Sequence, residues 1–289
     1  MGQYAKGKRK REKMDIEKLK EEIHKADKDL ADAFLRRMEA VKGIAEYKKA
    51  HGISAEDTIH DQPIVDSDAG FIEDPEIRSY FVPFLKSALK ASKALQNTMM
   101  AGQRIAYCGG MDPRDYTVAG NAFPGRTRVA FPNYAKTYQA VVDGECDVCV
   151  IPFEKSNSGE IGQVLDMMFA GDLFINKVVT VENESDTVRY AILSRVENDT
   201  VPAGADNRFM IMFTVKDEPG SLAKAISTLS SYGHNMSIMR SRHMPDLPWN
   251  YYFYAEAEGD VTTADGKKMF EDMKKVCQSV KMLGCYEAV

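Results

Sequence analysis

Three cations and two neutral hydrogen-bonding side chains stand at helical intervals in the first hundred residues. Lys20, Arg37 and Lys48 are 17 and 11 residues apart, which places all three near one long stripe of a single helix. Ser92 and Gln96 are four residues apart and share one face of another helix. Cations and amide donors in a dry pocket can bind carboxylates and stabilise developing negative charge. Spacing alone is more typical of a solvated surface, so the rest of the chain must support such a site.

Cys146 and Cys149 form a CxxC pattern, which alone is a weak signal for a metal or redox site. The pair stands at the entry of an apolar strand, and no second pair or nearby histidine completes a zinc site. The chain has five scattered cysteines, an odd count that indicates reduced thiols. We therefore interpret both residues as strand cysteines and expect no metal.

The composition is that of an ordinary soluble protein, with 28% charged and 44% hydrophobic residues in a chain of 289. That length suits two or three small domains. A formal net charge of −5 argues against nucleic-acid binding, and the apolar runs are too short to span a membrane. Residues 1–13 are basic but lack the apolar core of a signal peptide, so we expect a disordered tail and a cytoplasmic protein.

The periodicity divides the remaining chain into three parts. Residues 15–50 predict one amphipathic helix roughly 50 Å long, too long to bury its stripe in a compact monomer, which makes dimerisation plausible. Pro63 and Gly70 break the polar stretch 52–74, and Asp74-Pro75 predicts the cap of a second long helix over 75–100. Two long helices with a ragged middle section indicate an all-α domain.

From residue 103 short apolar strands alternate with helical stretches at 116–122, 134–143 and 159–169, which predicts an α/β sheet of about ninety residues. A polar segment with Pro and Gly follows and is interpreted as a linker over 197–207. Residues 208–289 predict the order βαββαβ, which is typical of a ferredoxin-like domain.

In this order the three parts resemble the bifunctional chorismate mutase–prephenate dehydratase family. The resemblance implies a multidomain protein: an all-α chorismate mutase module over 14–101, a single α/β lobe resembling part of prephenate dehydratase over 102–196, and a C-terminal α+β ACT domain over 208–289. In the first module it rests on LKEEI (19–23), LRRMEAVKGIAEYKK (35–49), an acidic segment near 57–61 and SKALQ (92–96).

The mutase resemblance implies roles for individual residues. Lys48 and Gln96 would be catalytic and contact the ether oxygen of chorismate. The substrate-binding set would be Lys20 from a second subunit, Arg37, Asp57, His60, Asp61 and Ser92. Arg37, Lys20 and Ser92 would serve the carboxylates, and the two aspartates the ring hydroxyl. Chorismate rearranges to prephenate by a pericyclic Claisen shift, so no cofactor and no covalent nucleophile is needed.

Two features of the first module depart from the family pattern, one at position 20 and one at the pair 60–61. Lysine stands at position 20 where the family usually has arginine, which keeps the charge but loses the bidentate fork. His60-Asp61 replaces an Arg-Glu pair, and aspartate is one methylene shorter than glutamate. Both changes predict an edited pocket.

The dehydratase resemblance covers only 104–196 and predicts that the second lobe of that enzyme is missing. The catalytic Thr-Arg-Phe triplet of the family is matched by Val188-Arg189-Tyr190, and valine can neither donate a proton nor form a hydrogen bond. Glu154-Lys155-Ser156 replaces the usual Glu-Asn-Ser. We therefore expect no dehydratase activity and interpret the lobe as a remnant scaffold.

The C-terminal part resembles the ACT domain of the same family through KDEPGSLAKAI (216–226) and MRSRHMPDLPWNYYFY (239–254). The resemblance implies an effector site for L-phenylalanine at a dimer interface. The matching residues are Gly220, Ser221, Leu222, Ser241 and Arg242.

The leading hypothesis is a chorismate mutase of phenylalanine biosynthesis, regulated through its ACT domain and acting as a homodimer. One alternative is a complete bifunctional enzyme whose missing lobe another chain supplies. The other is a non-catalytic sensor that binds phenylalanine or prephenate and regulates a partner.

Overall fold

A computed structural model describes residues 16–51, 53, 61–183, 185–197, 207–244 and 247–287. The side chains of Asp61, Gln62, Ala101 and residues 247–250 lie outside this description, although their backbone belongs to regular elements. The expected tail at 1–13 and most of the expected linker at 197–207 also lie outside the described residues. None of the described helices is long and apolar enough to cross a membrane.

Three helices form the N-terminal module: α1 (Ile16–Ala50), α2 (Asp61–Ala69) and α3 (Pro75–Ala101). Asp74 caps α3 as the sequence predicts, because its carboxylate accepts hydrogen bonds from the backbone N–H groups of Glu76 and Ile77. The expectation that Pro63 breaks the stretch 52–74 is wrong, because residues 61–69 form a continuous helix. Pro63 lies in the first turn of α2, where proline is tolerated because the N–H groups there have no helical acceptor.

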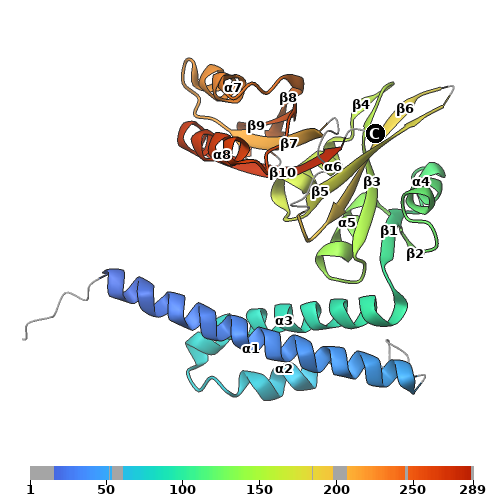
Figure 1. Cartoon of the computed structure of the whole chain (residues 1–289), viewed down its shortest axis with the longest axis vertical. Coiled ribbons are helices and arrows are strands. Elements are labelled where there is room, and N and C mark those ends of the chain that lie inside the picture. The colour runs from blue at the N-terminus through green and yellow to red at the C-terminus, as the bar shows by residue number, and fades with distance from the viewer. Residues whose placement is uncertain are drawn as a thin grey trace, which may run out of the picture.

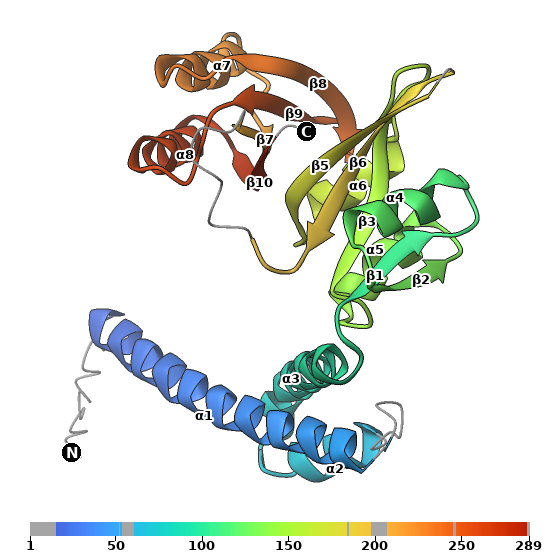
Figure 2. The same ribbon diagram turned by 45° about the vertical axis from the view of Figure 1, so that its right-hand side comes forward.

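Within the described residues, the two buried side chains of α1, Val41 and Ala45, both lie in its second half. Large apolar side chains at the middle of the helix and in its first half are exposed: Ile16, Ile23, Leu30, Phe34 and Leu35. Figure 2 shows this half of α1 extending beyond α2 and α3. The single long helix expected over 15–50 is therefore confirmed, and an apolar stripe along it is left uncovered by the described part of the chain.

The middle part is a mixed sheet covered by helices. Its elements are β1 (Arg104–Cys108), α4 (Arg114–Ala122), β2 (Thr127–Phe131), α5 (Tyr134–Val142), β3 (Val148–Lys155), β4 (Gly159–Glu160), α6 (Gly162–Ala170), β5 (Phe174–Glu182) and β6 (Thr187–Ser194). The strand order is β2-β1-β3-β6-β5, with β4 paired to β3. The strand–helix alternation is confirmed, except that 159–160 form a short strand paired with β3 rather than the start of a helix.

The C-terminal part has the order expected from sequence: β7 (Asn207–Thr214), α7 (Ser221–Ser231), β8 (Met236–Met244), β9 (Leu247–Glu258), α8 (Ala264–Val276) and β10 (Ser279–Glu287). The strand order β10-β7-β9-β8, with antiparallel neighbours, is the ferredoxin-like arrangement. Helices α7 and α8 cover one face of this sheet (Figure 1).

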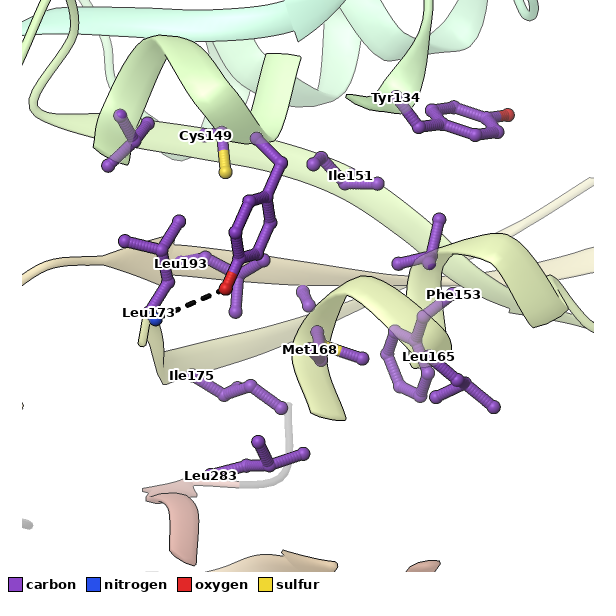
Figure 3. Close-up of a cluster of buried hydrophobic side chains, with 14 of the residues drawn as sticks. Tyr134, Cys149, Ile151, Phe153, Leu165, Met168, Leu173, Ile175, Leu193 and Leu283 are labelled. Carbon is purple, nitrogen blue, oxygen red and sulfur yellow. Dashed lines mark hydrogen bonds between the residues drawn. The ribbon is translucent and has the colours of Figure 1, made fainter. Parts of the chain in front are cut away.

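The other face of the C-terminal sheet packs on the middle part. Along β7, Phe209, Ile211 and Phe213 point into the core beneath the two helices, and the alternating Met210 and Met212 join the core of the middle lobe. In Figure 3, Leu283 of β10 lies beneath Ile175 and Met168 of that lobe. The middle and C-terminal parts therefore share one continuous core.

Candidate functional site

The first predicted cluster lies between α1 and α3, which lie side by side (Figures 1 and 2). Nε of Arg37 donates to Oγ of Ser92 at 3.0 Å, and that hydroxyl donates in turn to the backbone oxygen of Ala88 at 2.9 Å. Ser92 is only 8% exposed, and Arg37 is half-buried. The contact uses Nε, so the two terminal Nη groups, which grip carboxylates in bidentate pairs, are not the atoms bound to Ser92. The structure thus brings two of the predicted residues into contact.

Lys48 and Gln96 continue the same two helix faces. Lys48 follows Arg37 by about three turns, on the side of α1 that buries Val41 and Ala45, and is half-buried. Gln96 stands one turn after Ser92, is half-buried, and directs its side-chain nitrogen toward the sulfur of Met100 at 3.8 Å. α1 and α3 run in the same direction (Figure 1), so Lys48 lies about 16 Å beyond Arg37 along α1 and Gln96 about 6 Å beyond Ser92 along α3.

Lys20 does not join the other residues within one chain. It precedes Arg37 by 17 residues, or about 25 Å along α1, and pairs with Glu17 at 2.9 Å on an exposed surface. The expectation that a second subunit supplies it stays a prediction. Asp57 and His60 lie outside the described residues, and Asp61 opens α2 with its side chain also outside them.

The second predicted cluster lies where β1 and β3 end and the antiparallel β6 begins, here called the carboxyl edge of the sheet. Val188 is fully buried there, and the hydroxyl of Tyr190 donates to Asp115 at 3.1 Å. Asp115 is itself fully buried, and within the described residues its Oδ2 has no hydrogen-bond partner. Burial raises the pKa of Asp115 to about 7. No feature of the sequence at position 115 indicated this buried acid.

Arg189, the centre of the matched triplet, is bound by two carboxylates. Its Nη1 donates to Glu154 at 2.8 Å, and its Nη2 donates to Glu256 of β9. Glu256 is fully buried and also accepts from Arg208 and Tyr286 at 3.0 Å each. Burial alone would raise the pKa of Glu256, but the adjacent arginines hold it below its usual range. Arg189 therefore joins the middle lobe to the C-terminal part.

A second arginine at the carboxyl edge, Arg114, is also paired with carboxylates of the chain. Arg114 binds Asp112 through Nε at 2.9 Å and Nη2 at 2.6 Å, and binds Asp186 through Nη1 at 2.5 Å. The hydrogen bonds from Arg114 hold the pKa of Asp112 below its usual range. Lys155 lies 3.4 Å from the same carboxylate. Ligands of open α/β sheets bind at this kind of edge, and here the chain's own ion pairs occupy it.

The predicted effector residues lie at one end of the C-terminal sheet. Gly220, at a left-handed φ of 82°, precedes α7, which begins with Ser221 and Leu222. Ser241 and Arg242 are in the second half of β8. β7 and β8 are both antiparallel to β9 and so run in the same direction, which places the end of β8 at the same end of the sheet as the start of α7. The guanidinium of Arg242 binds Asp166 of α6 at 3.1 and 3.2 Å, so this residue also connects the two parts.

The cysteine pair lies in the core of the middle lobe. Both are buried. The interpretation as strand cysteines is confirmed for Cys149, which is in β3, and is wrong for Cys146, which lies in the turn before that strand. Burial raises the pKa of Cys146 to about 11, which keeps its thiol protonated near neutral pH. The described residues contain no group of histidine, cysteine and carboxylate side chains arranged to hold a metal ion.

No family model matches the chain. It is 26% identical over 146 residues to the bifunctional chorismate mutase/prephenate dehydratase of Aquifex aeolicus, covering 50% of this chain and 39% of that protein. The enzyme of the same name from Escherichia coli K12 is 23% identical over 111 residues, or 37% of this chain and 28% of that protein. The predicted resemblance is confirmed, and the chain spans well under half the length of these relatives.

Three solved structures share the fold over 64% of this chain. Prephenate dehydratase from Streptococcus mutans has a TM-score of 0.58 at 23% identity, with 98% of that chain covered. GqqA, described as a novel type of quorum quenching acylase, has 0.55 at 25%, with 95% covered. Prephenate dehydratase from Arthrobacter aurescens in complex with L-Phe has 0.54 at 16%, with 90% covered. The sheets of this chain thus resemble those of prephenate dehydratases.

Proposed function

We propose that this chain is a chorismate mutase that converts chorismate to prephenate in phenylalanine biosynthesis, with the face between α1 and α3 as its active site. The observation that carries the proposal is the contact of Arg37 with Ser92 across that face. Residues matched to one site from sequence blocks 55 positions apart meet at 3.0 Å. The named relatives, which contain a chorismate mutase activity, support the reaction class.

The rearrangement of chorismate needs fixed cations and hydrogen-bond donors, and the face between α1 and α3 carries both. Chorismate carries two carboxylates and must fold into a compact conformer before its ether bond breaks, so fixed cations accelerate the reaction by orientation. Arg37, held by its Nε, presents its Nη groups to one carboxylate. Lys48 and Gln96 donate to the ether oxygen as negative charge builds on it in the transition state. The substrate neither gains nor loses a proton in this rearrangement, so no general base takes part.

The uncovered stripe of α1 supports a homodimer in this proposal. A second copy packed along the first half of that helix would cover Ile23, Leu30 and Phe34 and bring the partner's Lys20 to the open end of the site. L-phenylalanine is proposed as an effector of the C-terminal domain, since the similar Arthrobacter protein was solved with L-Phe. That domain is proposed to be an ACT domain on its strand order.

Subunit complementation tests the enzyme and its shared site together. Purified chain should consume chorismate with formation of prephenate, whereas Lys20→Ala and Lys48→Ala should each be nearly inactive. After the two variants are unfolded together and refolded, half of the dimers are mixed and each holds one intact site, so about a quarter of the wild-type rate should return. Wild-type protein that leaves chorismate unchanged at high concentration would end the proposal. Active protein without complementation would remove only the role of Lys20.

A further inference from the structure

Two opposite faces of helix α3 contact different parts of the molecule. Ser92 and Gln96 lie on the face turned to α1, where the proposed mutase site is. Lys90, Ala94 and Thr98 lie half a turn away, because each residue advances the helix by about 100°. This second face is turned toward the middle lobe, which lies beside α3 in Figures 1 and 2.

The contacts of the second face converge on one loop. Residues 143–147 connect α5 to β3 and are called the clamp loop. Oγ1 of Thr98 donates to Oδ1 of Asp147 at 2.6 Å, and the other oxygen of that carboxylate accepts from the backbone N–H of Arg104 at 2.8 Å. One carboxylate therefore ties the last turns of α3 to the first residue of β1. Lys90 adds an ion pair to Asp143 at the other end of the loop.

Gly144 lets the clamp loop approach the helix closely. Its φ of 77° is in the left-handed region that favours glycine, and a Cβ at this position would lie 2.8 Å from Cβ of Ala94. Two small residues are thus needed for the loop to reach α3. The loop is also held from the lobe side, where Nη1 of Arg195 donates to the backbone oxygens of Cys146, at 3.0 Å, and Val141.

We propose that the clamp loop positions α3 so that Ser92 and Gln96 meet the substrate in the geometry that the reaction needs. The lobe that resembles part of a dehydratase is then the rigid support of the helical site. Thr98 and Asp147 are the positioning residues. Thr98 is exposed, but the Asp147 carboxylate accepts from both its hydroxyl and the backbone N–H of Arg104, so it joins α3 to β1 at two points. The Lys90–Asp143 ion pair joins two side chains only and contributes little at the surface. This inference rests on the proposed mutase function.

Substitutions at Thr98 test the inference in the full-length chain. Thr98→Val keeps the side-chain shape and removes the donor, so kcat for chorismate should fall roughly tenfold, since small misplacements of reacting groups are costly. Amide hydrogen exchange over 92–98 should become faster. Thr98→Ser restores the donor and should restore both readouts. Glu145→Ala is the matched control, an exposed residue of the same loop, and should change neither.

A steric pair gives an independent check. Gly144→Ala should lower kcat by forcing the loop and α3 apart, and Ala94→Gly in the same chain should recover part of the loss because it removes the atom that the new Cβ meets. Unchanged exchange over 92–98 in Thr98→Val, or faster exchange with unchanged kcat, would overturn the inference. If wild-type protein does not consume chorismate, the proposed function fails, and the exchange result alone then decides whether the clamp loop holds α3.

Discussion

The face between α1 and α3 and the carboxyl edge of the sheet both carry arginines, but the arginines have different neighbours. Arg37 lies against the neutral hydroxyl of Ser92, whereas Arg189 lies between two carboxylates and Arg114 between two others. An arginine whose hydrogen-bond partner is neutral can still pair with an anionic ligand. An arginine that is already paired with carboxylates of the chain contributes to structure instead. We therefore propose that the helical face binds the substrate and that the carboxyl edge supports the fold.

The largest expected effect is on the helical face. Lys48→Ala should lower kcat for chorismate by a factor on the order of 100 or more, because it removes the cation that we propose faces the ether oxygen, where negative charge develops in the transition state. The melting temperature should change little, since Lys48 is only half-buried. Lys49→Ala, one residue on and exposed, is the matched control. Full turnover in Lys48→Ala would contradict the assignment of the ether-oxygen contact.

The second effect is on stability and belongs to the carboxyl edge. Arg189→Met should lower the free energy of unfolding by about 3 kcal/mol, because it withdraws one partner from the fully buried Glu256. Arg240→Met breaks a half-exposed pair with Glu160 and should cost less than about 1 kcal/mol. Urea unfolding of both variants measures the difference, and chorismate turnover of folded protein should be unchanged in each. Equal costs would show that Arg189 is not a structural cation.

A smaller effect concerns pH. Asp115 has a pKa of about 7 in the folded chain against about 3.9 for an ordinary aspartate, so the folded state holds its proton more tightly. This contribution to stability is complete below about pH 4 and is lost as pH rises through 7, by up to about 1.4 kcal/mol per unit. Asp115→Asn should therefore flatten the fall in unfolding free energy between pH 5 and 7. The exposed Asp217→Asn should leave that slope unchanged, and an unaltered slope in Asp115→Asn would refute the buried acid as its cause.

The last substitution, Val188→Thr, is expected to have no effect on dehydratase activity. Val188→Thr restores the family's triplet, but the position is fully buried and its neighbour Arg189 is already bound by Glu154 and Glu256. We expect no conversion of prephenate to phenylpyruvate by this variant. Measurable dehydration of prephenate would show that the lobe lacks only one hydroxyl for activity. It would contradict the proposal that the carboxyl edge serves as support alone.

The sequence predicted most elements because periodicity is a local property. The long helix over 15–50, the capped helix after Asp74 and the βαββαβ order follow from it and agree with the structure. The two errors are local exceptions: Pro63 fits the first turn of α2, and residues 159–160 extend the sheet through pairing with β3. Neither depends on the pattern of the surrounding residues alone.

The two candidate sites differ in how much of each could be predicted from the sequence. Arg37 and Ser92 were assigned to one site through family resemblance rather than spacing, and the structure places them in contact. The pairs Arg189–Glu256 and Tyr190–Asp115 join residues 67 and 75 positions apart. Those contacts exist only once two sheets dock and α4 packs on the lobe, so no segment of sequence could reveal them. The filled state of the carboxyl edge was therefore not foreseen, although the missing threonine pointed in the same direction.

The most direct test supplies chorismate and prephenate separately to one preparation of the full-length chain and identifies the products of each. The account predicts that chorismate is consumed and prephenate accumulates, and that added prephenate is recovered unchanged at the same protein concentration. Intact chorismate would contradict the role of the helical face. Phenylpyruvate formed from prephenate would contradict the role of the carboxyl edge as support.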